Sequence, residues 1–108
     1  MSEFLILLKD RGEMDKSDTA VQKRIEEYKI WVAEIGEHYV GANRLEPNGV
    51  HIVEKDKMIT DGPFVETKEI IVGYVMIQAK NLEQAVKLAN NCPLLKDCEI
   101  FVRPILSS

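Results

Sequence analysis

The chain has 108 residues, of which 45% are hydrophobic and 30% charged. This size and composition are typical of one globular domain, so residues 1–108 are expected to form a single domain and two independent domains are excluded. The net charge is −4 and there is no basic stripe, which argues against direct nucleic-acid binding. No apolar stretch approaches the ~20 residues that cross a bilayer and no secretory signal is recognisable. A cytoplasmic location without a membrane partner is therefore expected.

The first half of the chain predicts a strand, a helix and a second strand. Residues 4–8 are all apolar, as in a strand buried on both faces. Ser17 or Thr19 can cap the next helix, in which apolar residues recur at steps of three and four until Gly36. Residues 39–45 are more polar and contain a glycine, which predicts a strand at the edge of a sheet.

The second half begins with a hairpin and the most β-prone run of the chain. Residues 51–53 and 58–60 are two short apolar runs separated by charged residues, and they predict the arms of a small hairpin. Residues 70–77 are rich in β-branched side chains and are apolar at odd and even positions, which indicates a central strand.

A second helix and a last strand complete the chain. Asn81 and Gln84 have the spacing of a capping box, and the helix that they begin must end near Cys92 because Pro93 follows. Residues 98–103 predict the last strand.

This order of elements predicts an α+β fold, a ferredoxin-like β-α-β-β-α-β sandwich with an extra hairpin. The first and third main strands lie at its centre. Two helices can cover only one face of such a sheet, whereas both central strands are apolar on both faces. We therefore expect a homodimer in which two sheets stack into a dimeric α/β barrel, with a cleft for a small molecule between the sheets.

Residues 60–69 combine a stiff turn with several ionisable groups. Gly62 and Pro63 fix the backbone after Asp61, and a carboxylate beside apolar Phe64 can have its pKa raised into the range of a general acid or base. The structural alternative is an Asx-turn, in which Asp61 only accepts backbone N–H groups of its own loop, and this is the more common arrangement. Asp61 is the candidate catalytic residue, with both interpretations open.

Four further residues are candidates for binding a ligand, namely Arg103, Glu66, Lys68 and Tyr74. The guanidinium fork of Arg103 can hold a carboxylate through two hydrogen bonds, although a structural pair with Glu99 or Glu66 is the alternative. Glu66 and Lys68 can equally belong to a solvated charge cluster, in which an exposed ion pair contributes only about 0–1 kcal/mol.

The cysteines and histidines do not have the spacing of a metal site. Cys92 and Cys98 are expected to be free thiols, and together with His38 and His51 they match no zinc-binding pattern. Cys92 follows a helix C-terminus, where the dipole disfavours a thiolate, and no glycine pattern of a nucleotide-binding loop occurs. We expect no metal and no cofactor.

The sequence resembles the YCII-related domain family, in particular the branch named for its Asp-Gly-Pro-Phe tetrapeptide. The matching features are residues 60–69, Gly73-Tyr74, Glu83, Ala85, Ala89, Pro93 and residues 99–104. The resemblance implies a ferredoxin-like fold and a dimer built by sheet stacking. It leaves the function open, because many members have no assigned activity, some are associated with extracytoplasmic-function sigma factors, and one relative in the superfamily removes chloride from a chlorinated hydroxyquinol.

The family comparison also concerns the first helix. The wider superfamily is thought to use a His and an Asp in an acid–base site, with the His in this helix. Here the helix has no His and contains Glu26, Glu27 and Tyr28 instead, so the pair cannot be transferred and Asp61 is placed only through its motif. Tyr28 and Trp31 lie near the apolar face of the helix and are expected to be core or interface anchors.

Two functional hypotheses follow. The first is a cytoplasmic homodimer that binds a small organic ligand in the cleft between the sheets, with acid–base catalysis of a lyase or isomerase type through Asp61. The alternative is a non-catalytic regulatory module that acts through an exposed surface, with a sigma factor as its partner.

Overall fold

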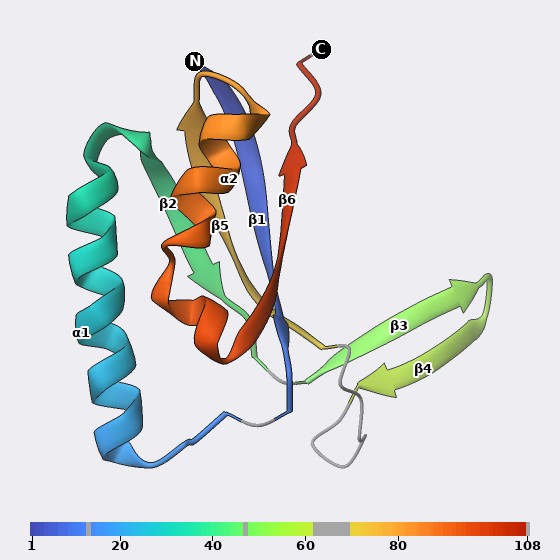
Figure 1. Cartoon of the computed structure of the whole chain (residues 1–108). Helices are drawn as coiled ribbons and strands as arrows, with labels where there is room; N and C mark the ends of the chain where they lie inside the picture. The colour runs from blue at the N-terminus through green and yellow to red at the C-terminus, as the bar shows by residue number, and fades with distance from the viewer. Residues whose placement is uncertain (13, 47, 62–69, 108) are drawn as a thin grey trace.

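A computed structural model describes residues 1–12, 14–46, 48–61 and 70–107, with the backbone alone for residues 59–61. Figure 1 shows two helices beside a twisted sheet, with a separate hairpin that projects from one end. In chain order the elements are β1 (Ser2–Asp10), α1 (Asp18–Ile35), the short 3₁₀ helix η1 (Gly36–His38), β2 (Tyr39–Arg44), β3 (Gly49–Glu54), β4 (Lys57–Asp61), β5 (Ile71–Ala79), α2 (Leu82–Asn90), the short 3₁₀ helix η2 (Pro93–Lys96) and β6 (Cys98–Pro104).

The sheet topology confirms the predicted fold class. Four strands lie in the order β2-β5-β1-β6, and each pair of neighbours is antiparallel. The apolar strands β1 and β5 are central and the more polar β2 is at an edge, as the sequence predicts. The hairpin is also confirmed, because β3 and β4 pair in a two-stranded sheet of their own.

Both helices begin at a side-chain cap. Ser17, rather than Thr19, caps α1, and its side chain accepts a hydrogen bond from the backbone N–H of Ala20. Asn81 caps α2 and accepts a hydrogen bond from the backbone N–H of Gln84 at 2.9 Å. Within the described ranges, neither helix is long and apolar enough to span a membrane.

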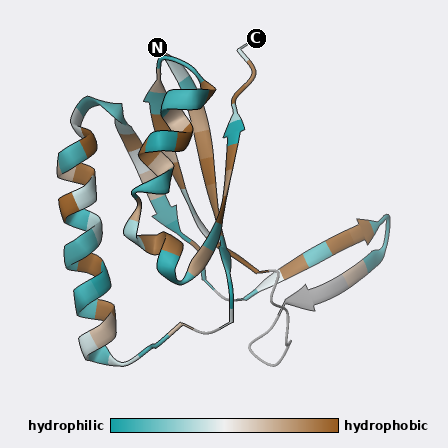
Figure 2. Ribbon diagram, viewed as in Figure 1, coloured by the Kyte–Doolittle hydropathy of each residue, from teal (hydrophilic) through white to brown (hydrophobic). Residues whose placement is uncertain are grey.

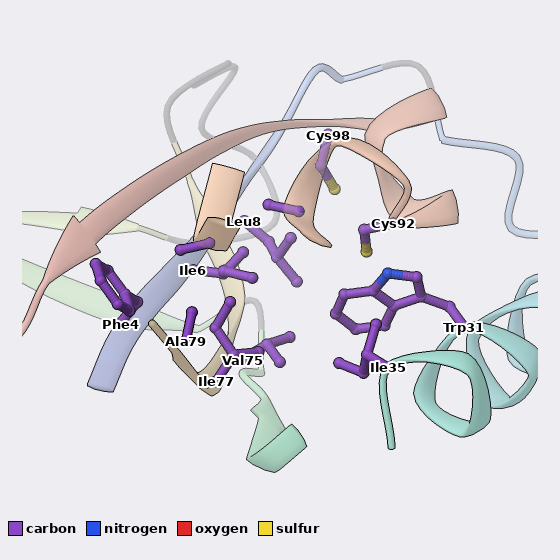
Figure 3. Packing of buried hydrophobic residues seen from close by; sticks show 12 residues of the cluster. Phe4, Ile6, Leu8, Trp31, Ile35, Val75, Ile77, Ala79, Cys92 and Cys98 are labelled. Atoms are coloured by element: carbon purple, nitrogen blue, oxygen red, sulfur yellow. The ribbon is translucent and has the colours of Figure 1, made fainter. Parts of the chain in front are cut away.

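The core lies between the helices and one face of the sheet. Alternate residues of β1 and β5 point into it, together with Trp31 and Ile35 of α1 and the alanines of α2 (Figure 3). The buried set comprises Phe4, Ile6, Leu8, Trp31, Ile35, Val75, Ile77, Ala79, Ala85, Ala89, Cys92 and Cys98. Trp31 is the largest of the fully buried side chains, and its indole N–H donates a hydrogen bond to the carbonyl oxygen of Leu88 at 3.0 Å.

The opposite face of the sheet, here called the far face, is also apolar. The strand register aligns Met76, Leu5 and Arg103 in one row across β5, β1 and β6. The adjacent row on the same face consists of Tyr74, Leu7 and Phe101. Both described helices pack on the other face, so neither of them covers these apolar side chains.

The β3–β4 hairpin extends away from the main sheet (Figure 1). Its residues Val50, Ile52 and Met58 are hydrophobic and exposed, and Figure 2 shows hydrophobic stretches along β3. The projection helps to explain a radius of gyration of 15.2 Å, compared with the about 13 Å expected of a compact domain of this length. None of the other described helices and strands packs extensively against this arm, and an isolated two-stranded hairpin is only marginally stable in water.

Candidate functional site

A cavity of about 950 Å³ lies between α1 and the helix-side face of the sheet. This volume is within the range of about 300–1,000 Å³ that is usual for small-molecule sites. Its walls are mainly apolar side chains, including Val21 and Ile25 of α1, Leu8 of β1, Val75 of β5 and Leu94 of η2. The cavity is therefore inside one chain and on the opposite side of the sheet from the cleft that the sequence predicts.

The cavity exists because α1 is held along one side only. Three of its residues contact the α2–η2 region: Arg24 pairs with Asp97 at 3.3 Å, Glu27 with Lys96 at 2.7 Å, and Trp31 with the Leu88 carbonyl. These positions are spaced by three and four residues, so they lie on one side of the helix. The neighbouring stripe with Val21 and Ile25 faces the sheet without filling the space, and both side chains remain only half-buried.

Small residues leave the sheet side of the cavity open. Ala42 of β2 lines it directly. Arg44 stands opposite Gly73 of β5 in the strand register. A Cβ atom on Gly73 would lie 3.0 Å from the backbone oxygen of Asn43 and 3.6 Å from Leu8 Cδ1, so the close approach of β2 and β5 requires a glycine here.

Two tyrosines supply hydroxyl groups to the lining. Tyr28 of α1 donates a hydrogen bond to the hydroxyl oxygen of Tyr39 at 3.2 Å, which links the helix to the start of β2. Burial raises the pKa of Tyr28, and the hydrogen bond to Tyr39 raises it further, so this hydroxyl stays protonated at neutral pH. The hydroxyl of Tyr74 lies on the far face instead, where it accepts a hydrogen bond from the Asn43 side-chain amide at 2.8 Å.

The charged side chains of the lining are mostly cationic. Arg24, Lys29 and Arg44 line the cavity with a single carboxylate, that of Glu46. Arg24 is already used structurally, because it pairs with Asp97 and donates a hydrogen bond to the Asp15 carbonyl oxygen. Within the described part of the chain, Lys29 and Arg44 form no salt bridge.

The predicted site residues occupy different places. Tyr74 is among the residues around the cavity, but the strand register puts its side chain on the far face beside Leu7. Arg103 lies on β6 and is exposed, and the strand register puts it on the far face near Leu5. Glu99 pairs with Lys9 at 3.5 Å rather than with Arg103. Arg103 and Tyr74 thus belong to adjacent rows of the sheet but are separated by β1.

The remaining predicted residues fall in or beside the region that is not described. Glu66 and Lys68 lie outside the described residues. The backbone of Asp61 ends β4 and pairs with Gly49, which follows the lining residue Glu46 by three positions. From chain reach and cross-strand spacing, the Cα atoms of Asp61 and Glu46 are within about 16 Å of each other. Asp61 as the catalytic residue stays a prediction.

The histidines and cysteines are not gathered in one place. His38 Nδ1 lies 2.8 Å from the Gln78 carbonyl oxygen, to which it donates, whereas His51 is in the separate hairpin. Cys92 and Cys98 are buried free thiols, as the sequence predicts. Among the described residues, no group of three or more His, Cys, Asp or Glu side chains is placed to hold a metal ion.

Both thiols are expected to react slowly. Burial raises the pKa of Cys92 from 9.0 to about 11, and burial together with Asp10 and Asp97 raises that of Cys98 to about 11. The thiolate fraction at pH 8 is then about 100-fold smaller than for an ordinary cysteine. Ellman's reagent should react with the native protein at least about 100-fold more slowly than with the urea-unfolded protein.

The same pKa shifts fix the direction of a pH effect on stability. The folded state keeps the neutral thiols, so their contribution to stability is complete below pH 9 and is lost as the pH rises through about 11. In urea unfolding, Cys98→Ala should show a smaller decrease in the free energy of unfolding between pH 9 and about 11 than the wild type. A fast reaction of either thiol in the native protein at pH 8 would contradict the assignment.

Sequence reasoning missed most of this cavity. It predicted an apolar face for the first helix, with Tyr28 as a core or interface anchor, but not that Tyr28 would line a cavity together with Val21 and Ile25. Arg44 and Tyr39 carried no motif, and only the register of β2 against β5 shows that they lie beside the cavity. A signal was available in the small residue Ala42, which lines the cavity where a larger side chain would fill part of it.

Comparisons with known proteins agree with this fold. A family profile of the YCII-related domain matches residues 3–107. Among solved structures, the chain is similar to 5-chloro-2-hydroxyhydroquinone dehydrochlorinase from Burkholderia phenoliruptrix in its complex with 2,5-dihydroxybenzoquinone, with a TM-score of 0.53 and 13% identity over 98% of this chain and 95% of that chain. At this identity the likeness concerns the fold alone, and no curated protein matches the sequence. The family match extends over nearly the whole chain, and the protein therefore belongs to the YCII-related domain family.

Proposed function

We propose that the protein binds a small organic molecule in the cavity between α1 and the sheet. The observation that carries this proposal is the cavity itself, about 950 Å³ with mainly apolar walls and a few polar groups. Apolar helix residues that remain half-buried beside such a space gain burial when a ligand fills it, at about 25 cal/mol per Å² of apolar surface. A relative of the same fold that is in complex with 2,5-dihydroxybenzoquinone supports a compact cyclic ligand.

Acid–base chemistry through Asp61 is the finer part of this proposal. Two observations support it. Asp61 belongs to the Asp-Gly-Pro-Phe motif, and it lies at the end of β4, which pairs with the strand that follows the cavity residue Glu46 in the sequence. If Asp61 acts on a bound molecule, Asp61→Asn should leave the affinity for an unreactive neutral probe within about twofold and should abolish turnover of any substrate.

The proposed assembly is a cytoplasmic homodimer in which two far faces stack. The far face presents two rows of apolar side chains, and the projecting hairpin exposes Val50, Ile52 and Met58. A second copy of the chain can cover both surfaces through a two-fold axis, as dimers commonly do. The cleft predicted between the sheets, with Arg103 at its side, is then a second place where a ligand could lie.

Filling the cavity tests the binding proposal. Ile25→Trp combined with Ala42→Phe places bulk on facing walls, and this variant should lower the affinity for 2-naphthalenemethanol or 2,5-dihydroxybenzoquinone at least about tenfold. The matched control is Ile30→Trp with Val40→Phe, which changes exposed residues on the same two elements. Affinity is measured by NMR titration, in which the amides of Ile25, Ala42 and Val75 should shift in the wild type.

The outcomes separate the possible sites. Equal affinities of the filled and control variants would overturn binding in the α1 cavity. If Arg103→Gln instead abolishes binding of the probe, the site is the cleft between the sheets. If none of these probes shifts any amide, the proposal of a small-molecule site fails.

The regulatory module is the second candidate, and the exposed hairpin is the observation that favours it. Val50, Ile52 and Met58 form an apolar strip of the kind that partners recognise. In this case a sigma factor would contact the hairpin, and Ile52→Lys would weaken that contact while the cavity variants had no effect.

A further inference from the structure

The charge of the cavity lining differs in sign from that of the whole protein. The chain carries a net charge of −4. The lining holds three cationic side chains, Arg24, Lys29 and Arg44, against the single carboxylate of Glu46. A cationic cleft with low-dielectric walls focuses its potential, so it attracts anions even on an acidic protein.

Arg44 is the cation best placed to meet a ligand. It is exposed, it lines the cavity from the end of β2, and it pairs with Gly73 on the helix-side face of the sheet. Arg24 is engaged by Asp97 and by the Asp15 carbonyl, whereas Arg44 forms no salt bridge within the described residues.

The remaining lining favours an apolar body on the ligand. Val21, Ile25 and Leu94 provide apolar walls, and the Tyr28–Tyr39 pair closes one side with hydroxyl groups that are already hydrogen-bonded to each other. Few polar groups are therefore left to satisfy a ligand that is hydrophilic throughout. A ligand with one charged end and an apolar remainder matches both parts of the lining.

We propose that the ligand of this cavity is an amphiphilic anion, with an apolar ring or chain beside α1 and a carboxylate-like group held by Arg44 at the end of β2. This inference rests on the proposed function, because it specifies the chemical class that the same cavity takes. The planar fork of Arg44 can donate two parallel hydrogen bonds to such a group, and Lys29 adds positive charge to the same cavity.

A matched pair of probes tests the charge preference. 2-Naphthoate and 2-naphthalenemethanol share the ring system and differ in charge. At 50 mM salt the wild type should bind the carboxylate about tenfold more tightly, since charge-assisted hydrogen bonds are the stronger ones. In 0.5 M salt the preference should shrink. Amide shifts at Ile25, Ala42 and Val75 in NMR titrations report that both probes occupy this cavity.

Variants of Arg44 test whether this side chain causes the preference for the carboxylate probe. Arg44→Gln should abolish the preference for 2-naphthoate and leave the affinity for the neutral probe unchanged, and Arg44→Lys should retain part of the preference through its charge. Lys23→Gln removes an exposed cation of α1 that does not line the cavity, and it should behave like the wild type.

The inference and the proposed function fail differently. Equal binding of the two probes, or a preference that survives in Arg44→Gln, overturns the anionic ligand while the cavity remains a binding site. Absence of binding by both probes overturns both.

Discussion

Replacing Trp31 with alanine is expected to lower the free energy of unfolding by about 3–5 kcal/mol, the usual cost of truncating a fully buried aromatic side chain. Trp31 is only 2% exposed and joins α1 to the core, where it lies among Ile35, Cys92 and the central strands (Figure 3). The substitution leaves a void and also removes the hydrogen bond to the Leu88 carbonyl. Because Trp31 is the most deeply buried residue of α1, loss of this anchor should destabilise the helix wall of the cavity.

Urea unfolding monitored by circular dichroism measures the effect. The matched control is Ile30→Ala, the adjacent residue on the same helix, which is 60% exposed and should change stability by less than about 0.5 kcal/mol. Trp31→Phe keeps most of the volume and should cost less than Trp31→Ala. Similar losses for Trp31→Ala and Ile30→Ala would show that α1 does not depend on this anchor.

Placing a charge at the centre of the far face is expected to separate the proposed dimer. Leu7 lies between Tyr74 and Phe101 in the strand register, so Leu7→Lys puts an ammonium group into the stacked interface. Burial of an unpaired charge costs several kcal/mol, and about 4 kcal/mol raises a dissociation constant about a thousandfold. The wild type should sediment as two chains at micromolar concentration and the variant as one chain of 12.3 kDa.

The control for this experiment is a lysine on another exposed apolar position. Val86 of α2 is 48% exposed and lies on the helix layer, so Val86→Lys should leave the dimer intact. Circular dichroism verifies that both variants fold. A wild-type protein that sediments as a single chain would refute sheet stacking and with it the predicted cleft between the sheets.

The fold was predictable because its signals are local and agree with one another. Continuous apolar runs marked β1 and β5, and the candidate caps, Ser17 or Thr19 for α1 and Asn81 for α2, marked both helix starts. Strand ends were less predictable: β1 extends over Ser2–Asp10, beyond its apolar run, because its flanking polar residues still pair with β5 and β6. The length of β1 is set by backbone hydrogen bonding to its neighbours, which cannot be read from the pattern of side chains.

The candidate site was less predictable because it depends on distances between elements. The sequence motif identified Asp61 as the candidate catalytic residue. The Asp61 side chain and the residues Glu66 and Lys68 lie outside the described part of the structure. Tyr74 was identified as a candidate for ligand binding; the strand register puts its side chain on the far face, and its role stays a prediction. Arg44 could not be identified, because only the β2–β5 register and the distance of α1 from the sheet give it a role.

The central position of β1 also bears on synthesis of the protein. β1 is synthesised before its partners β5 and β6, which follow both the first helix and the hairpin in the sequence. The four-stranded sheet therefore cannot close until β6 has been synthesised, and Phe4, Ile6 and Leu8 lack their neighbours in the nascent chain until then. Such long-range pairing slows folding and leaves apolar segments open to aggregation, so the protein is expected to be a client of chaperones that bind emerging chains.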